Sequence, residues 1–296
     1  MALPARLLML RRRFLFTAAG LPVLLAQQPP DPGKVEWLCP MDKDVRSAQP
    51  GVCPRCGMKL VPGIPDPIEY RLLLDVTPAA WKPGQPIRMR FEVRDPRTNQ
   101  RVTKLQVIHE KLFHLFIVSG DLSYFAHEHP EPQPDGTLLF ETTLPKPGFY
   151  RILGDFYPEG GTPQLAVLSI LSAGSDQVSF ATPRLTAATN PQSTANLKIS
   201  LRTEPAAPIA GLKTMLFFEL QPAEGLEPYL GAWGHMLVAS ADLIDLIHTH
   251  PFLASGGPDL QFNVVFPRPG MHRLWVQFQR RGVVNTAVFT VPVRGL

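Results

Sequence analysis

The stretch 113–130, FHLFIVSGDLSYFAHEHP, returns 121 residues later as 234–251, GHMLVASADLIDLIHTHP. Seven of the eighteen positions are identical, and every histidine recurs while most apolar residues differ. Each copy carries the spacing H-x12-H-x-H. The pattern predicts two copies of one domain with the same three histidines in each: His114, His127 and His129 in the first, and His235, His248 and His250 in the second.

The histidine spacing suits a shared metal ion. In a β-strand, residues two apart lie on one face, so His127 and His129 should project side by side with Cα atoms about 7 Å apart. His114 lies in the apolar run 112–118, which predicts a buried strand that can bring a third nitrogen. Nitrogen ligands favour Cu(II) or Zn(II), so we predict one imidazole site per repeat. The alternative is that these histidines hydrogen bond to the backbone and were inherited twice with the fold.

Other residues near the histidines are set apart from these sites. His109 and His272 have no histidine counterpart in the other repeat, so we predict that both lie at the surface or rim, as does Glu110. Met236 follows His235 and should face the opposite side of the strand, which disfavours it as a ligand.

The rest of the chain predicts an all-β protein. It has 33 prolines among 296 residues and no long helical pattern, which favours many turns. Alternating or apolar runs predict strands on both sides of the histidine stretch, at 70–76, 87–93, 137–144, 149–156 and 164–170. About seven short strands over ~100 residues indicate an Ig-like sandwich. We predict two such tandem domains, 66–172 and 196–296, joined by a polar linker, 173–195.

The first 26 residues resemble an export signal. Four arginines precede an apolar run, 14–26, that is too short to span a bilayer. RRRFL at 11–15 resembles the core of a twin-arginine signal, with an ordinary secretory signal as the alternative. Cleavage after Ala26 would remove four of the 29 basic residues and none of the 25 acidic ones, leaving no net charge and no basic nucleic-acid face. We therefore predict a periplasmic or secreted protein that is not integral to a membrane.

All three cysteines lie in residues 37–62, WLCPMDKDVRSAQPGVCPRCGMKLVP, with the spacing C-x13-C-x2-C. Three thiolates and two thioethers in so short a segment predict a site for Cu(I) or Zn(II). The segment is too small to hold a shape without a metal. The candidate ligands are Cys39, Met41, Cys53, Cys56 and Met58. A disulfide between Cys53 and Cys56 is the alternative in an oxidising compartment.

Residues 36–62 resemble the short heavy-metal-binding domain of some copper-transporting P-type ATPases and of adaptor subunits of copper and silver efflux systems. That family has an aromatic residue, then C-P-M-H-P, then G-x-C-P-x-C-G-M-x-L. The matching residues are Cys39, Pro40, Met41, Gly51, Cys53, Pro54, Cys56, Gly57, Met58 and Leu60. Asp42 and Lys43 replace the family's His and second Pro, so an imidazole ligand is missing. The resemblance implies a metal-binding domain over residues 35–63.

These observations predict an exported heavy-metal-binding protein, with copper as the ion, that acts in metal sequestration, handling or resistance and passes the ion to an efflux pump or a periplasmic acceptor. A copper-dependent oxidoreductase with one histidine-bound copper per sandwich is the rival interpretation. A structural pair of Ig-like modules behind a metal sensor is the third. Blue copper would need a cysteine in a sandwich, and neither has one. No catalytic residues are predicted, because the chain has no G-x-S-x-G elbow, phosphate loop or H-E-x-x-H helix.

Overall fold

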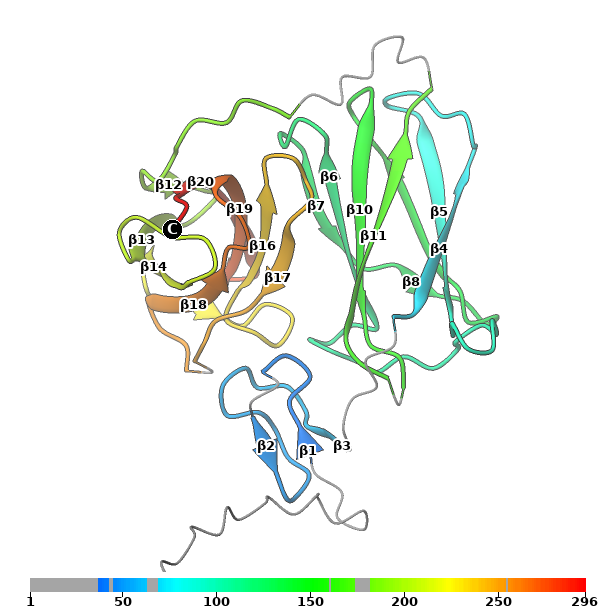
Figure 1. Cartoon of the computed structure of the whole chain (residues 1–296), viewed down its shortest axis with the longest axis horizontal. Helices are drawn as coiled ribbons and strands as arrows, with labels where there is room; N and C mark the ends of the chain where they lie inside the picture. The colour runs from blue at the N-terminus through cyan, green and yellow to red at the C-terminus, as the bar shows by residue number, and fades with distance from the viewer. Residues whose placement is uncertain (1–36, 43–44, 63–68, 160, 174–181, 254) are drawn as a thin grey trace, which may run out of the picture. The chain divides into compact units, whose positions relative to one another are not determined.

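The computed structural model describes residues 37–42, 45–62, 69–159, 161–173, 182–253 and 255–296 (Figure 1). The predicted signal peptide, 1–26, lies outside the described residues. Within the described ranges we find no helical segment with the length and hydropathy needed to cross a bilayer. Val35–Leu296 forms one unit.

The first repeat is a sandwich of two antiparallel sheets. One sheet has the order β4-β5-β9-β8, and the other has the order β11-β10-β6-β7. The strands are β4 (Arg71–Thr77), β5 (Pro86–Arg94), β6 (Phe113–Ser119), β7 (Phe125–Glu128), β8 (Glu131–Pro132), β9 (Leu138–Thr143), β10 (Phe149–Phe156) and β11 (Gln164–Leu171). Their facing apolar side chains form one core, which includes the fully buried Trp81, Phe91 and Tyr150. The predicted all-β sandwich fold is confirmed.

The second repeat has the same plan. Its sheets have the orders β12-β13-β14-β18 and β15-β19-β16-β17, and β20 pairs with β19. The strands are β12 (Gln192–Ser193), β13 (Lys198–Glu204), β14 (Lys213–Gln221), β15 (Leu226–Glu227), β16 (His235–Ser240), β17 (Leu246–Thr249), β18 (Asp259–Val265), β19 (Gly270–Arg280) and β20 (Val283–Val293). The described end of the segment predicted as a linker, 182–195, runs along this repeat: Ala188 bridges Thr290, and β12 adds an edge strand to β13.

The histidine-bearing strands β6 and β16 are buried on both faces, which explains their continuous apolar sequence. In β6, Leu115 and Ile117 enter the core of the first repeat. Phe116 and Val118 point the other way, into a separate cluster that contains residues of both repeats. This interface cluster takes equivalent positions from each: Phe116, Val118, Leu122 and Leu153 from the first, and Leu237, Ala239, Leu243 and Trp275 from the second.

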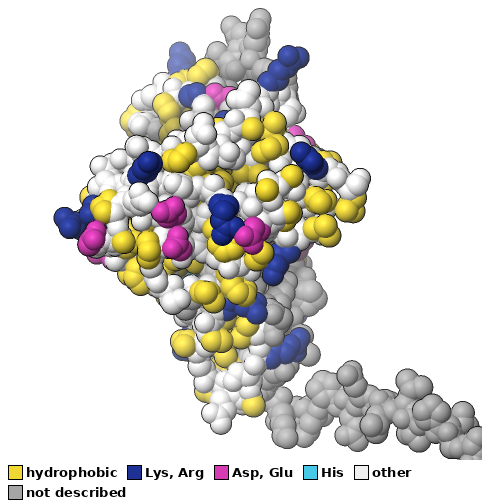
Figure 2. All heavy atoms as spheres, turned by 90° about the vertical axis from the view of Figure 1, so that its left-hand side faces the viewer, with side chains coloured by type: hydrophobic (Ala, Val, Ile, Leu, Met, Phe, Trp, Pro, Cys, Tyr) yellow, Lys and Arg dark blue, Asp and Glu magenta, His cyan; other side chains and the backbone are white. Residues whose placement is uncertain are grey.

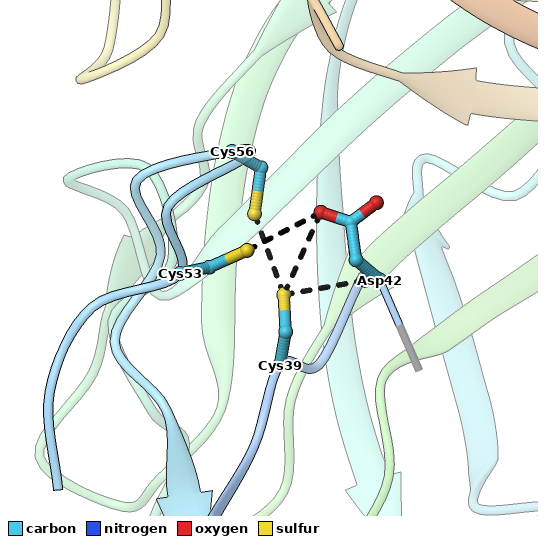
Figure 3. Close-up of side chains that lie close together, drawn as sticks. All are labelled: Cys39, Asp42, Cys53 and Cys56. Carbon is cyan, nitrogen blue, oxygen red and sulfur yellow. Dashed lines mark hydrogen bonds between the residues drawn. The ribbon is translucent and has the colours of Figure 1, made fainter. Parts of the chain in front are cut away.

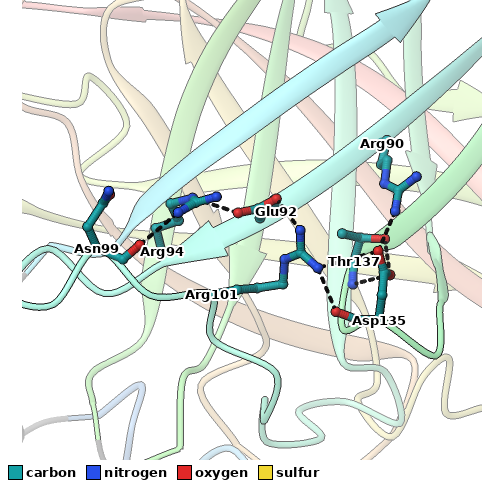
Figure 4. A network of polar contacts seen from close by, with 7 residues as sticks. All are labelled: Arg90, Glu92, Arg94, Asn99, Arg101, Asp135 and Thr137. Atoms are coloured by element: carbon teal, nitrogen blue, oxygen red, sulfur yellow. Dashed lines mark hydrogen bonds and ion pairs between the residues drawn. The ribbon is translucent and has the colours of Figure 1, made fainter.

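A surface network holds the loop that follows β5, around Asn99 and Arg101 (Figure 4). Arg101 contacts Glu92 at 2.8 Å and Asp135 at 3.4 Å, and Arg94 donates to the Asn99 carbonyl at 2.7 Å. Arg90 pairs with Asp135 as well. Exposed ion pairs contribute little individually, so the network orders the loop more than it stabilises the fold. On the face shown in Figure 2, charged side chains of both signs are interspersed with apolar ones.

Candidate metal centre

The cysteine segment is a small three-stranded sheet with two tight turns. Its strands β1 (Trp37–Leu38), β2 (Arg46–Ser47) and β3 (Val61–Pro62) have the order β2-β1-β3. Cys39 directly follows β1. The second turn is closed by Cys53 N donating to the Met58 carbonyl at 2.6 Å and by Gly57 N donating to the Cys53 carbonyl at 2.9 Å. Gly57 has φ +75, a left-handed conformation that favours glycine.

The two turns bring the three cysteines together with Asp42 (Figure 3). Cys39 Sγ lies 3.4 Å from Cys56 Sγ, and Asp42 Oδ2 lies 3.4 Å from Cys53 Sγ and 3.8 Å from Cys39 Sγ. One donor atom from each of the four lies within 4.8 Å of the others. Sulfurs on one tetrahedral ion at ~2.3 Å would be roughly 3.8 Å apart, so the set fits a metal. Asp42 occupies the position of the family's histidine and supplies an oxygen there, which the sequence analysis missed.

The three thiols differ in acidity. The pKa of Cys39 is lowered to about 6, mainly because the Cys56 thiol donates a hydrogen bond to its sulfur. Hydrogen bonds from the backbone amides of Asp42 and Met41 add to this effect. The same contact raises the pKa of Cys56, and burial raises the pKa of Cys53. All three cysteines are free, and Cys39 is the most acidic of them.

The two methionines predicted as ligands contact the cysteines through their backbone. Amide hydrogen bonds from Met41 and Met58 reach Cys39 and Cys56 respectively. The Met58 side chain is buried beside Leu60, and Met41 packs against the same cluster. These contacts place both methionines in the framework that supports the cysteines, and a thioether ligand stays a prediction.

The first histidine set converges on one point. His114 lies on β6, His127 lies on β7, and His129 directly follows β7. His114 Nδ1 is 3.1 Å from His127 Nε2 and 3.2 Å from His129 Nε2. Two nitrogens bound to one tetrahedral ion at ~2.0–2.1 Å would be roughly 3.4 Å apart. The spacing therefore fits a shared ion.

Two of these rings present lone pairs to each other. His114 Nε2–H donates to the Ile108 carbonyl at 3.0 Å. His127 Nδ1–H donates to Gln277 Oε1 at 2.7 Å, and the Gln277 amide nitrogen donates to Thr286 Oγ1. A neutral imidazole has a single N–H, so His114 Nδ1 and His127 Nε2 both carry lone pairs. Lone pairs 3.1 Å apart repel, and a shared cation would relieve that repulsion.

In the second set the same kinds of contact surround His235. The three histidines here whose donor atoms all lie within 4.8 Å of one another are, however, His109, His235 and His250, with His248 outside that group. His235 Nδ1 lies 3.0 Å from His250 Nε2 and 3.5 Å from His248 Nε2. His235 Nε2–H donates to the Tyr229 carbonyl at 2.9 Å, and His248 Nδ1–H donates to Asp155 Oδ2 at 2.5 Å. The Nδ1 atom of His235, which faces His248 and His250, therefore carries a lone pair as well.

Each set is oriented by the other repeat. Gln277 on β19 accepts from His127 of the first repeat, and Asp155 on β10 accepts from His248 of the second. Asp155 and Gln277 are equivalent positions, 122 residues apart. An acceptor on the far ring nitrogen fixes the tautomer and aims the near nitrogen at a metal. Sequence reasoning missed both residues because they lie outside the histidine stretch.

The two sets adjoin at the interface between the repeats. The ring centroid of His114 is 5.9 Å from those of His235 and His248. The ring of His109 lies 3.9 Å from that of His250. The sequence predicted one site within each repeat, whereas the structure gathers seven histidines into one cluster.

Two placements predicted for histidines are wrong. His109 is 8% exposed and His272 is 1% exposed, although both were expected at the surface or rim. His109 lies at a turn that enters the interface, and His272 lies on the buried strand β19 against Phe266. Glu110 is exposed as predicted, and Met236 points into the core of the second repeat, away from the histidine cluster.

Burial favours the neutral form of six of the seven clustered histidines. It lowers the pKa of His109 to about 3, that of His114 to about 4 and that of His129 to about 3. The pKa values of His127, His235 and His250 also lie well below 6.5, with burial as the main cause. A neutral imidazole is the form that binds metals.

A cavity of about 250 Å³ connects the two kinds of site. Asp42 and Cys56 line it on the cysteine side, and His250 and Phe252 line it on the side of the second repeat. The Arg55 guanidinium lies 5.0 Å from the centroid of the Phe252 ring.

Comparisons with known proteins agree with this architecture. A family model described as Heavy metal binding domain matches residues 37–62, which confirms the resemblance found in the sequence. A second, described as Domain of unknown function (DUF8832), matches residues 66–169 and 185–295. No curated protein matches the chain.

Several solved structures are similar to the chain at low identity. The Escherichia coli adhesin FdeC is 15% identical over 81% of this chain and 71% of that one, with a TM-score of 0.25. The Yersinia pseudotuberculosis adhesin InvE is 12% identical over 75% and 60%, with a TM-score of 0.25. The fibronectin(III)-like modules of Clostridium thermocellum CbhA are 10% identical over 76% and 95%, with a TM-score of 0.21.

Proposed function

Because the chain belongs to the DUF8832 family, with two copies of that domain behind a Heavy metal binding domain, we propose that it is an exported copper-binding protein that sequesters the ion and hands it on. Metal binding follows from the heavy metal binding domain itself. The choice of copper, the export and the handling role are the proposal.

The observation that carries the proposal is the convergence of Cys39, Cys53 and Cys56 with Asp42. Three thiolates are the ligands that soft ions prefer, and the partly exposed Cys56 gives an ion access from the cavity. The histidine cluster supplies nitrogen ligands, which suit Cu(II) or Zn(II). A protein with a sulfur site and two sets of nitrogen ligands, with a cavity lined by residues of both kinds, can hold copper in either common oxidation state.

Replacing Cys53 by Ser is expected to weaken Cu(I) binding at the cysteine segment at least a hundredfold. A direct ligand should contribute more than the second-shell partners whose loss costs ~10–100-fold. Because thiols must lose protons on binding, affinity should also fall as the pH drops. The measurement is competition of the reduced full chain with a Cu(I) chelator under anaerobic conditions.

The matched control is Ser47→Ala, which removes a hydroxyl from β2 outside the ligand set. Asp42→His, which restores the family's residue, should keep binding. Equal Cu(I) affinity in the parent and in Cys53→Ser would refute the cysteine site.

Export is tested separately, through Arg11 and Arg12. Changing both to Lys should leave an uncleaved precursor in the cytoplasm if the route is twin-arginine, because that route requires the arginine pair. Immunoblots of fractionated cells, compared with an Arg6→Lys control, report the precursor and the mature chain. Normal export of the double variant would contradict the twin-arginine route, and loss of export on deleting 14–26 tests the signal itself.

A further inference from the structure

The turn that carries His109 has a counterpart with the same backbone in the second repeat. Ile108 and Lys111 exchange backbone hydrogen bonds of 2.8 and 3.0 Å around His109 and Glu110, whose φ values are 47 and 65. Two positive φ angles inside a two-residue hairpin loop define a type I′ turn. Few non-glycine residues adopt a left-handed backbone conformation, so the presence of His109 at the tip of this turn needs an explanation.

In the second repeat the corresponding turn runs from Tyr229 to Ala232, which exchange hydrogen bonds of 2.7 and 3.1 Å. Leu230 and Gly231 have φ values of 51 and 71. Leu230 therefore stands where His109 stands in the first repeat. The backbone is conserved between the turns while the side chain that reaches the interface differs.

The His109 ring crosses to the second histidine set. Its centroid lies 3.9 Å from that of His250 and 5.3 Å from that of His235. One nitrogen from each of these three residues lies within 4.8 Å of the others. His109 is thus about as close to His235 and His250 as these two are to each other, since their own centroids lie 4.5 Å apart.

The hydrogen bonds of His109 leave one nitrogen for a ligand. The ring hydrogen bonds to the backbone of Leu230, and Nε2 is buried with no hydrogen-bond partner among the described residues. The N–H donor is therefore Nδ1, and Nε2 keeps its lone pair. Buried polar atoms without partners are uncommon and need an explanation, which a bound ion would supply.

We propose that His109 is a metal ligand together with His235 and His250, beside His248, so that the second site draws imidazoles from both repeats while the first has three from one repeat. The inference rests on the proposed metal-binding function of the histidine cluster. Leu230 cannot ligate, so the first set keeps an open position. The hydrogen-bond acceptors of the histidines add to the expected difference in metal affinity. His248 donates to the carboxylate of Asp155, whereas His127 donates to the amide oxygen of Gln277. A carboxylate partner raises ligand basicity.

We therefore expect the two histidine sites to differ in their affinity for Zn(II). A full chain with Cys39, Cys53 and Cys56 changed to Ser isolates the histidine cluster and is titrated with Zn(II) against a chromophoric chelator. The parent should bind two ions, one of them at least tenfold more tightly. His109→Leu, which copies the second repeat, should weaken the tighter site at least tenfold and leave the other unchanged.

Two further variants sharpen the test. Glu110→Gly copies the neighbouring position of the second turn and should leave both affinities as they are. Leu230→His should add a fourth nitrogen to the first set and bring its affinity toward that of the second. Unchanged Zn(II) binding in both His109→Leu and Leu230→His would overturn the role of His109. Absence of Zn(II) binding in the parent itself would overturn the histidine site as a whole.

Discussion

The metal-free protein is expected to lose about 4 kcal/mol of unfolding free energy between pH 7 and pH 5 from His109 and His114 alone. Burial lowers the folded-state pKa of these histidines to about 3 and about 4, while the unfolded chain takes up protons near 6.5. The unfolded state therefore binds more protons below pH 6.5. Each histidine costs ~1.4 kcal/mol per pH unit until the pH reaches its folded value.

Urea unfolding at intervals between pH 7.5 and pH 4.5, in the presence of a chelator, measures this loss. The carboxylate of Asp242 does not contribute there, because its pKa is lowered to about 2 and its stabilisation is lost only below pH ~4. His109→Leu should reduce the slope by ~1.4 kcal/mol per pH unit, and Glu110→Gln should not change it. A free energy of unfolding that stays level across this range would show that His109 and His114 are not buried and neutral.

Replacing Phe116 by Ala is expected to cost about 3–5 kcal/mol of unfolding free energy. The ring is 1% exposed and packs between the histidine sets, with its centroid 4.3 Å from that of His127 and 4.7 Å from that of His248. Its loss leaves a cavity in the interface cluster and frees both imidazoles to move. Zn(II) affinity of the histidine cluster should therefore fall together with stability.

Chemical denaturation and chelator competition measure the two effects on the same variant. Val167→Ala is the control, because this side chain lies on edge strand β11 and is 40% exposed. We expect the control to change stability by no more than ~0.5 kcal/mol. A Phe116→Ala protein as stable as this control would contradict the docking of the two repeats through Phe116.

The fold was predictable from the sequence because strand periodicity and an internal repeat are local signals. The apolar run around His114 predicted a buried strand, and β6 is one. The run could not reveal what covers the second face of β6, since apolar residues on both faces look the same whether the cover is a sheet of the same domain or of another. The interface between the repeats was therefore missing from the prediction.

The spacing anticipated the approach of His114, His127 and His129, whereas the residues that accompany the histidines could not be predicted from it. Asp155 and Gln277 act through contacts across the interface, and their chemical types differ although their positions match. The position of His109 was predicted wrongly, because the second repeat has no matching histidine and this argued against a place among the metal ligands. Asp42 was counted as the loss of a ligand, whereas its carboxylate lies beside the sulfurs.

The interface cluster uses the same four positions of each repeat, and the orienting contacts run in both directions across it. Such a surface is self-complementary, which is the geometry of an isologous twofold dimer. Covalent linkage turns that dimer into an intramolecular one, whose effective concentration is set by the connecting chain and does not fall on dilution. The two halves are also free to diverge independently, which identical subunits of a homodimer cannot do, and the pair His109 and Leu230 records that divergence.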